Sequence, residues 1–342
     1  MQDMSVSEGD IALVHALEVN PRATWSLLGE VLGVTPMTVA RRWAKLFDQG
    51  AAWIAVLPGP VAWHSFAMIG INCASPRIDD VAATIAQDPL AITVEVTAGR
   101  YDLLVAVLAP DMATLSWYIT DRLNRIQYIT STTSAIATEV FSEGSQWRIG
   151  AISRNQEHDL APSSTGIRPT TPDVSDVDRE LINALSYDGR MSFGDLASRI
   201  DRNASTVMRR LDRLLKHGLV TLRCEIASSL SGWPLHASLQ FRVSPQHLGE
   251  VGRELAKWPE VRMCVALAAE RNLMVSIWIR NTSELTLFEM KVLREFPHVI
   301  VVDRTLDLRV MKRTGHMLDE AGRSIGVVPI DLWSQVQPRQ VR

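Results

Sequence analysis

Apolar residues recur with helical spacing between Thr35 and Gly50. Val39, Trp43 and Leu46 fall at positions i, i+4 and i+7, so a helix would bring all three to one face. The threonine can cap such a helix, and the proline that follows it suits the first helical position. The glycine can supply the left-handed residue that ends it. The pattern therefore predicts one amphipathic helix with a buried stripe.

Two shorter apolar patterns precede this helix. Leu13 and Leu17 predict a first helix, and the segment TWSLLGEVLG, residues 24–33, predicts a second one that Thr24 caps and Gly33 ends. Three short helices joined by tight turns are typical of the helix-turn-helix arrangement, whose last helix enters the major groove of DNA. The side chains of the third helix expected to contact DNA are Thr38, Arg41, Arg42 and Lys45.

The same pattern returns 168 residues later in the chain. Residues 10–51 align with residues 178–219 without a gap, and Asp10 matches Asp178 while Arg22 matches Arg190. An alignment of this length indicates a duplication. In the second copy, the residues expected to contact DNA are Ser205, Thr206, Arg209, Arg210 and Arg213.

Strands and helices alternate after each three-helix segment. In the first copy, strands are expected at HSFAMIGIN, AITVEVTA, YDLLVAVLA and TSTTSAIATEV, with helices at IDDVAATIAQD and MATLSWYITDRLNRI. The second copy follows the same order at an offset of about 170 residues, from HASLQFRVS to VIVVDRTLDLRV. The order βαββαβ predicts a ferredoxin-like sandwich. The expected fold class is α+β, with two tandem units, each a three-helix helix-turn-helix domain followed by a βαββαβ domain.

These patterns divide the chain into six segments. We expect helix-turn-helix domains at 1–56 and 176–224, βαββαβ domains at 60–150 and 230–315, a linker at 151–175 and a tail at 316–342. Proline, serine and threonine are frequent from residue 157 to 176, which predicts an extended, mobile linker. The tail is expected to dock on the second βαββαβ domain through Val327, Val328, Ile330 and Trp333.

Charge is distributed unevenly along the 342 residues, although the net charge is only −3. The segment from Thr35 to Leu46 holds three basic residues and no acidic one. The segment from Arg199 to His217 holds six basic residues and two acidic ones, so it is the more basic of the two. Local positive charge on both third helices favours double-stranded DNA as a partner.

Several classes of protein are not indicated. The N-terminus lacks the features of a signal peptide, and apolar runs such as Leu103 to Ala109 are too short to cross a bilayer, so we expect a cytoplasmic protein without membrane contact. Cys73, Cys224 and Cys264 lie far apart in the sequence, so reduced thiols are expected. Since no metal-ligand spacing, phosphate loop or catalytic set stands out, we expect no metal site, cofactor or enzymatic activity.

The segment DVDRELINALSYDGRMSFGDLASRIDRNASTVMRRLDRLLKHGLV, residues 176–220, followed by a βαββαβ domain, resembles the Lrp/AsnC family of transcription regulators. The first copy adds TAGRYDLLV, residues 97–105, which looks like that family's Gly-x-Tyr-Asp turn. The resemblance covers nearly the whole chain in tandem, whereas the usual family member has one unit.

The resemblance implies a small-molecule effector, an amino acid or a related metabolite, bound between βαββαβ domains that also mediate dimerisation. It assigns the effector site to Gly99, Tyr101 and Asp102. It further implies a homodimer or a higher homo-oligomer. The second copy has Ala269, Arg271 and Asn272 at the equivalent places, which departs from the family pattern.

Alternative interpretations stay open at this stage. The arginine-rich faces are also compatible with solvated surfaces, and Gly99 and Asp102 with an ordinary hairpin turn. Siroheme decarboxylases share the tandem architecture, but they carry a histidine and a tyrosine near the second strand of the βαββαβ domain. That strand has no histidine in either copy here. A third alternative is a metabolite-sensing module that does not bind DNA.

Overall fold

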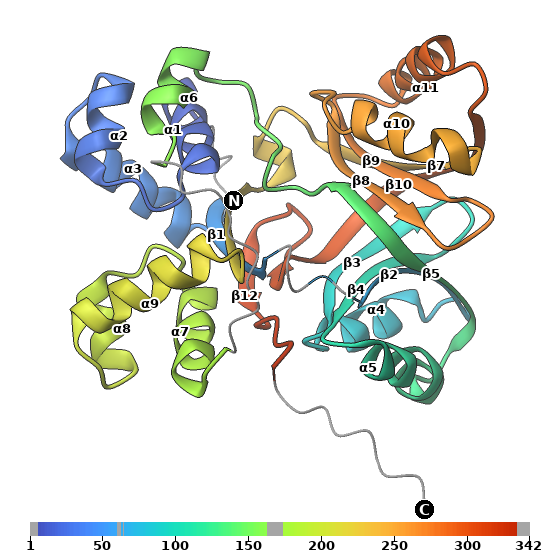
Figure 1. Ribbon diagram of the computed structural model, residues 1–342, viewed down its shortest axis with the longest axis horizontal. Coiled ribbons are helices and arrows are strands. Elements are labelled where there is room, and N and C mark those ends of the chain that lie inside the picture. The colour runs from blue at the N-terminus through green and yellow to red at the C-terminus, as the bar shows by residue number, and fades with distance from the viewer. Residues whose placement is uncertain (1–5, 60–62, 64, 163–173, 334–342) are drawn as a thin grey trace, which may run out of the picture. The chain divides into compact units, whose positions relative to one another are not determined.

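The computed structural model describes residues 6–59, 63, 65–162 and 174–333. Within these residues the chain forms two compact units (Figure 1). Of the described residues, the head unit takes 6–59, 63, 148–162, 174–230 and 314–333, and the body unit takes 65–147 and 231–313. Each unit therefore combines segments from both sequence copies.

The head unit contains both three-helix segments. The first comprises α1 (Glu8–Val19), α2 (Trp25–Leu32) and α3 (Pro36–Asp48), followed by β1 (Ala52–Pro58). The second comprises α7 (Asp176–Tyr187), α8 (Phe193–Arg199) and α9 (Ala204–Lys216), followed by β6 (Val220–Ile226). The predicted caps Thr24 and Thr35 are confirmed, since each side chain accepts a backbone N–H in the first turn, and Ser192 and Asn203 cap α8 and α9 in the same way. The predicted stripe of α3 is buried, and so are Val207, Leu211 and Leu214 at the equivalent positions of α9.

The two three-helix segments are joined within the head unit by a two-stranded antiparallel sheet. Strand β1 pairs with β6 in a register that runs from Ala52 opposite Ile226 to Pro58 opposite Val220. Helix α1 packs on β6, and helix α7 packs on β1. Each three-helix segment therefore packs against the strand that follows the other one, and the two form a pair.

The body unit contains both βαββαβ segments. The first comprises β2 (Ser65–Cys73), α4 (Ile78–Ala86), β3 (Ala91–Ala98), β4 (Leu103–Ala109), α5 (Met112–Trp117) with the short turns Tyr118–Arg122 and Leu123–Arg125, and β5 (Ile129–Ser142). The second comprises β7 (Leu235–Arg242), α10 (Pro245–Leu255), β8 (Val261–Leu267), β9 (Leu273–Ile279), α11 (Ser283–Glu295) and β10 (Ile300–Arg313). The expected order of elements is confirmed in both copies.

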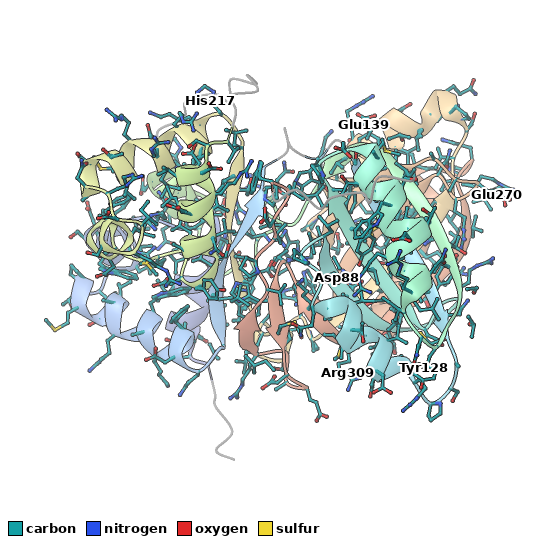
Figure 2. All side chains as sticks on the ribbon, turned by 90° about the horizontal axis from the view of Figure 1, so that it is seen from below. Asp88, Tyr128, Glu139, His217, Glu270 and Arg309 are labelled. Atoms are coloured by element: carbon teal, nitrogen blue, oxygen red, sulfur yellow. The ribbon has the colours of Figure 1, made fainter. Side chains whose placement is uncertain are left out.

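The eight strands of the body unit form one closed antiparallel sheet. Their order is β10-β3-β4-β2-β5-β8-β9-β7, and β7 pairs with β10 to close the ring. The two copies meet where β5 pairs with β8 and where β3 pairs with β10. The long strands β5 and β10 make these junctions by pairing with a different neighbour along each half. At the second junction Lys312 Nζ donates to the carbonyl of Asp88 at 2.9 Å, and Asp88 is labelled in Figure 2.

The segment expected to be an extended linker is partly helical. Residues Arg154–Leu160 form helix α6, which begins with a reciprocal capping box between Ser153 and Gln156 and buries Leu160. The helix packs on α1 and α2 of the head unit. The prediction is therefore wrong for α6, and residues 163–173 of the expected linker lie outside the described residues.

The tail adds two short strands to the head unit. Strand β11 (His316–Leu318) pairs with β12 (Ser324–Val327), and the Ser324 N–H donates to the carbonyl of Gly50 at 2.8 Å. The ring of His316 stacks on Trp53 with 5.3 Å between centroids. The described part of the tail groups with the head unit, whereas the sequence predicted docking on the second βαββαβ domain.

Two expectations from composition can be compared with the described residues. All three cysteines are free, as expected. Within the described part of the chain, no helix is both long and apolar enough to cross a membrane.

Candidate DNA-binding and effector sites

Helix α3 presents a basic face to solvent. Arg41 and Lys45 are exposed, and neither makes an ion pair with any described residue. Arg42 is partly buried because its guanidinium lies against the backbone of Gly9 in α1, where a Cβ atom would clash with it. The hydroxyl of Thr38 lies 2.9 Å from that of the cap residue Thr35. Of the predicted residues on α3, Arg41 and Lys45 therefore have the most freedom to reach a ligand.

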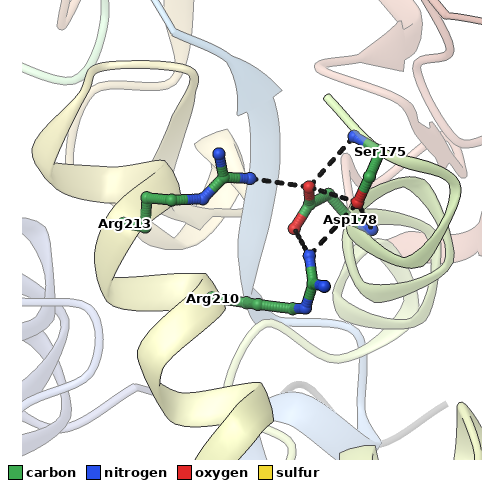
Figure 3. A network of polar contacts seen from close by, with 4 residues as sticks. All are labelled: Ser175, Asp178, Arg210 and Arg213. Carbon is green, nitrogen blue, oxygen red and sulfur yellow. Dashed lines mark hydrogen bonds and ion pairs between the residues drawn. The ribbon is translucent and has the colours of Figure 1, made fainter. Parts of the chain in front are cut away.

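The equivalent face of α9 is tied to its own domain. The carboxylate of Asp178, in the first turn of α7, is fully buried and accepts from Arg210 Nη1 at 3.1 Å and from Arg213 Nη2 at 2.6 Å (Figure 3). It also accepts from the hydroxyl of Ser175 at 2.6 Å and from its N–H at 3.0 Å. Burial alone would raise the pKa of Asp178, but the Ser175 and Arg210 hydrogen bonds and the Arg213 charge outweigh it and lower that pKa.

This network changes which arginines of the second copy are available to DNA. Arg210 and Arg213 keep about a third of their side-chain surface exposed, at 32% and 33%, but their charge is already matched by Asp178. Arg209 is exposed and forms no ion pair with a described residue. The sequence predicted that the third helix of the second copy, α9, is more basic than α3. This holds for the number of basic residues, but Arg210 and Arg213 are already paired with Asp178.

Two aligned arginines join the pair of three-helix segments. Arg22 donates to the carbonyls of Gly189 and Met191 at 2.8 and 3.0 Å. Its counterpart Arg190 donates to the carbonyls of Pro21 and Ala23 at 2.6 and 2.8 Å. Burial lowers the pKa of both guanidinium groups, that of Arg190 to about 10. Each arginine thus donates to the other three-helix segment, so the two segments are held together by contacts related by a pseudo-twofold axis.

Helix α6 is attached to the first three-helix segment through a buried histidine. The Nδ1 atom of His15 accepts the N–H groups of Ala151 and Ile152, both at 2.9 Å, and its Nε2 atom lies 3.0 Å from Glu157 of α6. Burial lowers the pKa of His15, and the neutral ring suits an acceptor at Nδ1. The second copy has Asn183 at this position, so the attachment is specific to the first copy.

The residues that the family resemblance assigns to an effector lie in the hairpin between β3 and β4. Gly99 has φ of 152°, a conformation that favours glycine. Asp102 Oδ2 accepts the N–H of Cys73 at 2.8 Å, and the backbone carbonyls of Tyr101 and Asp102 accept from Thr97. The Asp102 carboxylate therefore supports the turn.

A cavity of about 40 Å³ lies beside this hairpin, inside the body unit. Tyr101 lines it, whereas Gly99 and Asp102 do not. Arg271, which occupies the place of Tyr101 in the second copy, lines it too and donates to the Tyr101 hydroxyl at 2.8 Å and to Asp303 at 2.9 Å. The other lining residues are Met68, Gly70, Leu104, Thr133, Ser134, Ala135, Gln240, Leu267 and Ala269.

A second group of titratable side chains is buried in the body unit. Glu95 of β3, His236 of β7 and Asp307 of β10 place one ligand-type atom each within 4.8 Å of the others, and His236 Nδ1 lies 2.6 Å from Asp307. Burial raises the pKa of Glu95 to about 8 and that of Asp307 to about 7. Arg313 is buried nearby and lowers both values. The Arg313 charge therefore offsets part of the negative charge that these two carboxylates can carry.

The sequence comparisons agree with this division into heads and bodies. The profile of the AsnC-type helix-turn-helix domain matches residues 7–46, that of a winged helix-turn-helix DNA-binding domain matches residues 175–221, and that of the Lrp/AsnC ligand binding domain matches residues 66–147. Fold and sites thus define a helix-turn-helix protein with a ligand-binding domain. The chain therefore contains helix-turn-helix and ligand-binding domains of the Lrp/AsnC type.

Curated relatives match about one third of the chain or slightly more. An uncharacterized HTH-type transcriptional regulator of Pyrococcus horikoshii is 27% identical over 117 residues, which are 34% of this chain and 74% of the relative. The HTH-type transcriptional regulator LysM of Saccharolobus solfataricus is 25% identical over 138 residues, or 40% of this chain and 96% of its own length. Both relatives are named as regulators of transcription.

One solved structure matches nearly the whole chain in fold. The siroheme decarboxylase NirDL superposes with a TM-score of 0.58 at 14% identity, over 90% of this chain and 93% of its own. At this identity the likeness describes the fold alone.

Proposed function

We propose that this chain is a DNA-binding transcriptional regulator that carries both halves of an Lrp/AsnC-type dimer. The observation that supports this most strongly is the head unit, in which β1, β6 and the Arg22 and Arg190 exchange hold two helix-turn-helix segments as one pair. Paired heads of this kind bind two half-sites of one DNA molecule. One chain thus supplies what a family member with one unit obtains from two chains.

In this proposal α3 and α9 each enter a major groove. Thr38, Arg41, Arg42 and Lys45 contact DNA from α3, and Ser205, Thr206 and Arg209 contact it from α9. Arg210 and Arg213 take a double role, because they hold α9 on Asp178 and still reach solvent with part of their guanidinium surface. Unpaired arginine and lysine charges contribute to affinity through counterion release.

The body unit is proposed to sense a small molecule with a carboxylate group. The cavity beside Tyr101 already contains the guanidinium of Arg271, which prefers carboxylates in a two-pronged geometry. A carboxylate that replaces the Tyr101 hydroxyl and Asp303 at Arg271 would open the cavity to an amino acid or a related metabolite. Binding in the body unit would then change the DNA affinity of the head unit through coupling of about 1–3 kcal/mol.

Salt titration of DNA binding tests the DNA-binding part. Replacing both Arg41 and Arg209 with alanine should reduce the slope of log K against log salt by about 1.8, since each lost phosphate contact removes about 0.9. Arg294→Ala, an exposed change on α11 of the body unit, is the control and should leave the slope unchanged. Equal slopes for the wild type and the double variant would refute the assignment of these two arginines.

Calorimetry with a panel of amino acids tests the sensing part. Arg271→Ala should abolish binding of the ligand that the wild type recognises, whereas Asp102→Asn should keep it if the turn persists. If only the Asp102→Asn variant lost ligand binding, the site would have to be assigned to the Gly99 hairpin.

A siroheme decarboxylase-like enzyme is the second candidate function. It is favoured by the whole-chain fold likeness and by His236, which the fold brings to within 3.6 Å of Glu95 on the second strand of the first βαββαβ domain. Titration with an iron tetrapyrrole tests it, because binding would shift the Soret band and His236→Ala would remove the shift. An unchanged spectrum at saturating tetrapyrrole would reject this candidate.

A further inference from the structure

The two recognition helices, α3 and α9, differ at several outward positions, and at two of these one helix has a methionine where the other has none. At the second helical residue α3 has Met37 where α9 has Ser205, and at the fifth residue α3 has Ala40 where α9 has Met208. The methionines are solvent-exposed, Met37 at 81% and Met208 at 52%. Each helix therefore presents one unpacked thioether, but at a different position.

The second and fifth helical residues lie on the same face, because residues three apart are neighbours on a helix. Three residues correspond to about 4.5 Å along the axis at about 1.5 Å per residue. Successive bases on one DNA strand are about 3.4 Å apart. The methionine of α9 is thus displaced from that of α3 by about one base step.

The chemistry of the differing side chains distinguishes bases. An exposed methionine offers an apolar contact, which in the major groove suits the methyl group of thymine. The hydroxyl of Ser205 donates to Asn203 Oδ1 at 2.8 Å, so its oxygen retains only acceptor capacity toward a partner. In the major groove the groups that donate to an acceptor are the amino groups of adenine and cytosine.

Because the two three-helix segments form a pair, a difference between the side chains of α3 and α9 should appear as a difference between the two half-sites of the bound DNA. A symmetric protein pair reads two identical, inverted half-sites, so its site is a palindrome. In the head unit the backbone pairing of β1 with β6 and the Arg22 and Arg190 exchange keep the pseudo-twofold arrangement. The side chains at the reading positions break that symmetry.

We propose that the chain recognises a non-palindromic DNA site, in which Met37 and Met208 select thymine methyl groups at positions that differ by one base step between the half-sites. At the position where Met37 faces thymine in one half-site, Ser205 faces an adenine or cytosine amino group in the other. This inference rests on the DNA-binding function proposed above. It adds the class of site and the residues that determine its specificity.

Selection of bound duplexes from a random pool tests the inference on the full chain. The wild type should enrich a site with two unequal half-sites. The double variant Met37→Ser with Ala40→Met gives α3 the residues of α9 at these two positions, and it should enrich a site whose half-sites are equal at the two base positions they face. This variant should also bind the wild-type site about tenfold more weakly, the loss typical of one mismatched contact. Met290→Ala, an exposed change on α11, is the control and should select the wild-type site.

Two outcomes would overturn the inference while leaving the proposed function in place. One is a palindromic site selected by the wild type, and the other is an unchanged site selected by the double variant. The absence of any enriched duplex, together with no salt-dependent retention of DNA, would overturn both the inference and the proposed function. Since all substituted side chains are solvent-exposed or lie on an outward helix face, circular dichroism should confirm that the variants fold.

Discussion

The substitution Asp178→Asn is predicted to destabilise the attachment of helix α9 to α7. The change keeps the size of the side chain and an oxygen that can accept from Ser175, but it removes the charge that pairs with Arg210 and Arg213. Breaking a buried ion pair costs about 3–5 kcal/mol when one partner is left buried. Both arginines here are about a third exposed and regain water, so we expect a loss of about 2 kcal/mol.

Native-state hydrogen exchange of the α9 amides measures this loss locally. A destabilisation of about 2 kcal/mol should speed exchange roughly thirtyfold, because about 1.4 kcal/mol corresponds to a factor of ten. Asp10→Asn is the matched control. Asp10 forms the same capping box with Ser7, but no ion pair joins it to α3 among the described residues. We expect that change to cost at most about 0.5 kcal/mol.

The pH dependence of hydrogen exchange tests whether the charge of Asp178 is what stabilises α9. The pKa of Asp178 is lowered on folding, so its stabilisation is complete above the unfolded value of 3.8 and is lost as pH falls through the lower folded value. The wild type and Asp178→Asn should therefore differ at neutral pH and converge in strong acid. Equal exchange of α9 at neutral pH, or equal losses for the Asp178 and Asp10 variants, would refute the network as the anchor of α9.

Three further predictions concern the other buried polar groups. Arg190→Ala removes two hydrogen bonds to carbonyls of the first copy and should destabilise the head unit by about 3 kcal/mol in chemical denaturation, whereas the exposed change Arg179→Ala should have almost no effect. The pKa of His15 is lowered on folding, so protection of the Ala151 amide should be complete above about pH 6.5 and fall as pH decreases; constant protection down to pH 4 would contradict this. The pKa of Glu95 is raised from 4.5 to about 8, so its burial costs stability increasingly as pH rises between these values, and Glu95→Gln should raise Tm at pH 8 more than at pH 5. An equal change in Tm at both pH values would show that ionisation is not the cause.

Local features of the sequence account for the elements that were predicted correctly. The helices of the head unit begin at side chains that cap the residue three positions later, and their buried stripes follow the helical period. The strands of the body unit are short apolar runs separated by turn residues. Both signals act within a few residues, so they can be read without knowledge of the tertiary fold.

Contacts between distant residues account for what the sequence did not reveal. Arg213 and Asp178 are 35 residues apart, Tyr101 and Arg271 are 170 apart, and His236 and Asp307 are 71 apart. Only the tertiary fold brings these side chains into contact. A charged residue that looks free in the sequence can therefore be part of an ion pair or hydrogen bond in the structure. The alignment of the two copies was a usable signal in one case, since it places Arg271 at the position of Tyr101.

The prediction of an extended linker missed helix α6 because it relied on composition and not on the local capping signal. The frequent serine, threonine and proline residues after position 157 favour a linker, but Ser153 and Gln156 already form a capping box at the start of the same segment. The helix is then stabilised by tertiary contacts, such as the bond from Gln156 Nε2 to the carbonyl of Val31 at 2.9 Å. Such contacts are not visible in a polar sequence.

Capture of the genomic DNA fragments bound by the full chain tests the central claim most directly. If the head unit reads DNA through α3 and α9, the wild type should enrich a discrete set of sites, and replacing both Arg41 and Arg209 with alanine should remove most of that enrichment. Equal recovery of all fragments by the wild type, or an identical set of sites for the wild type and the double variant, would contradict it.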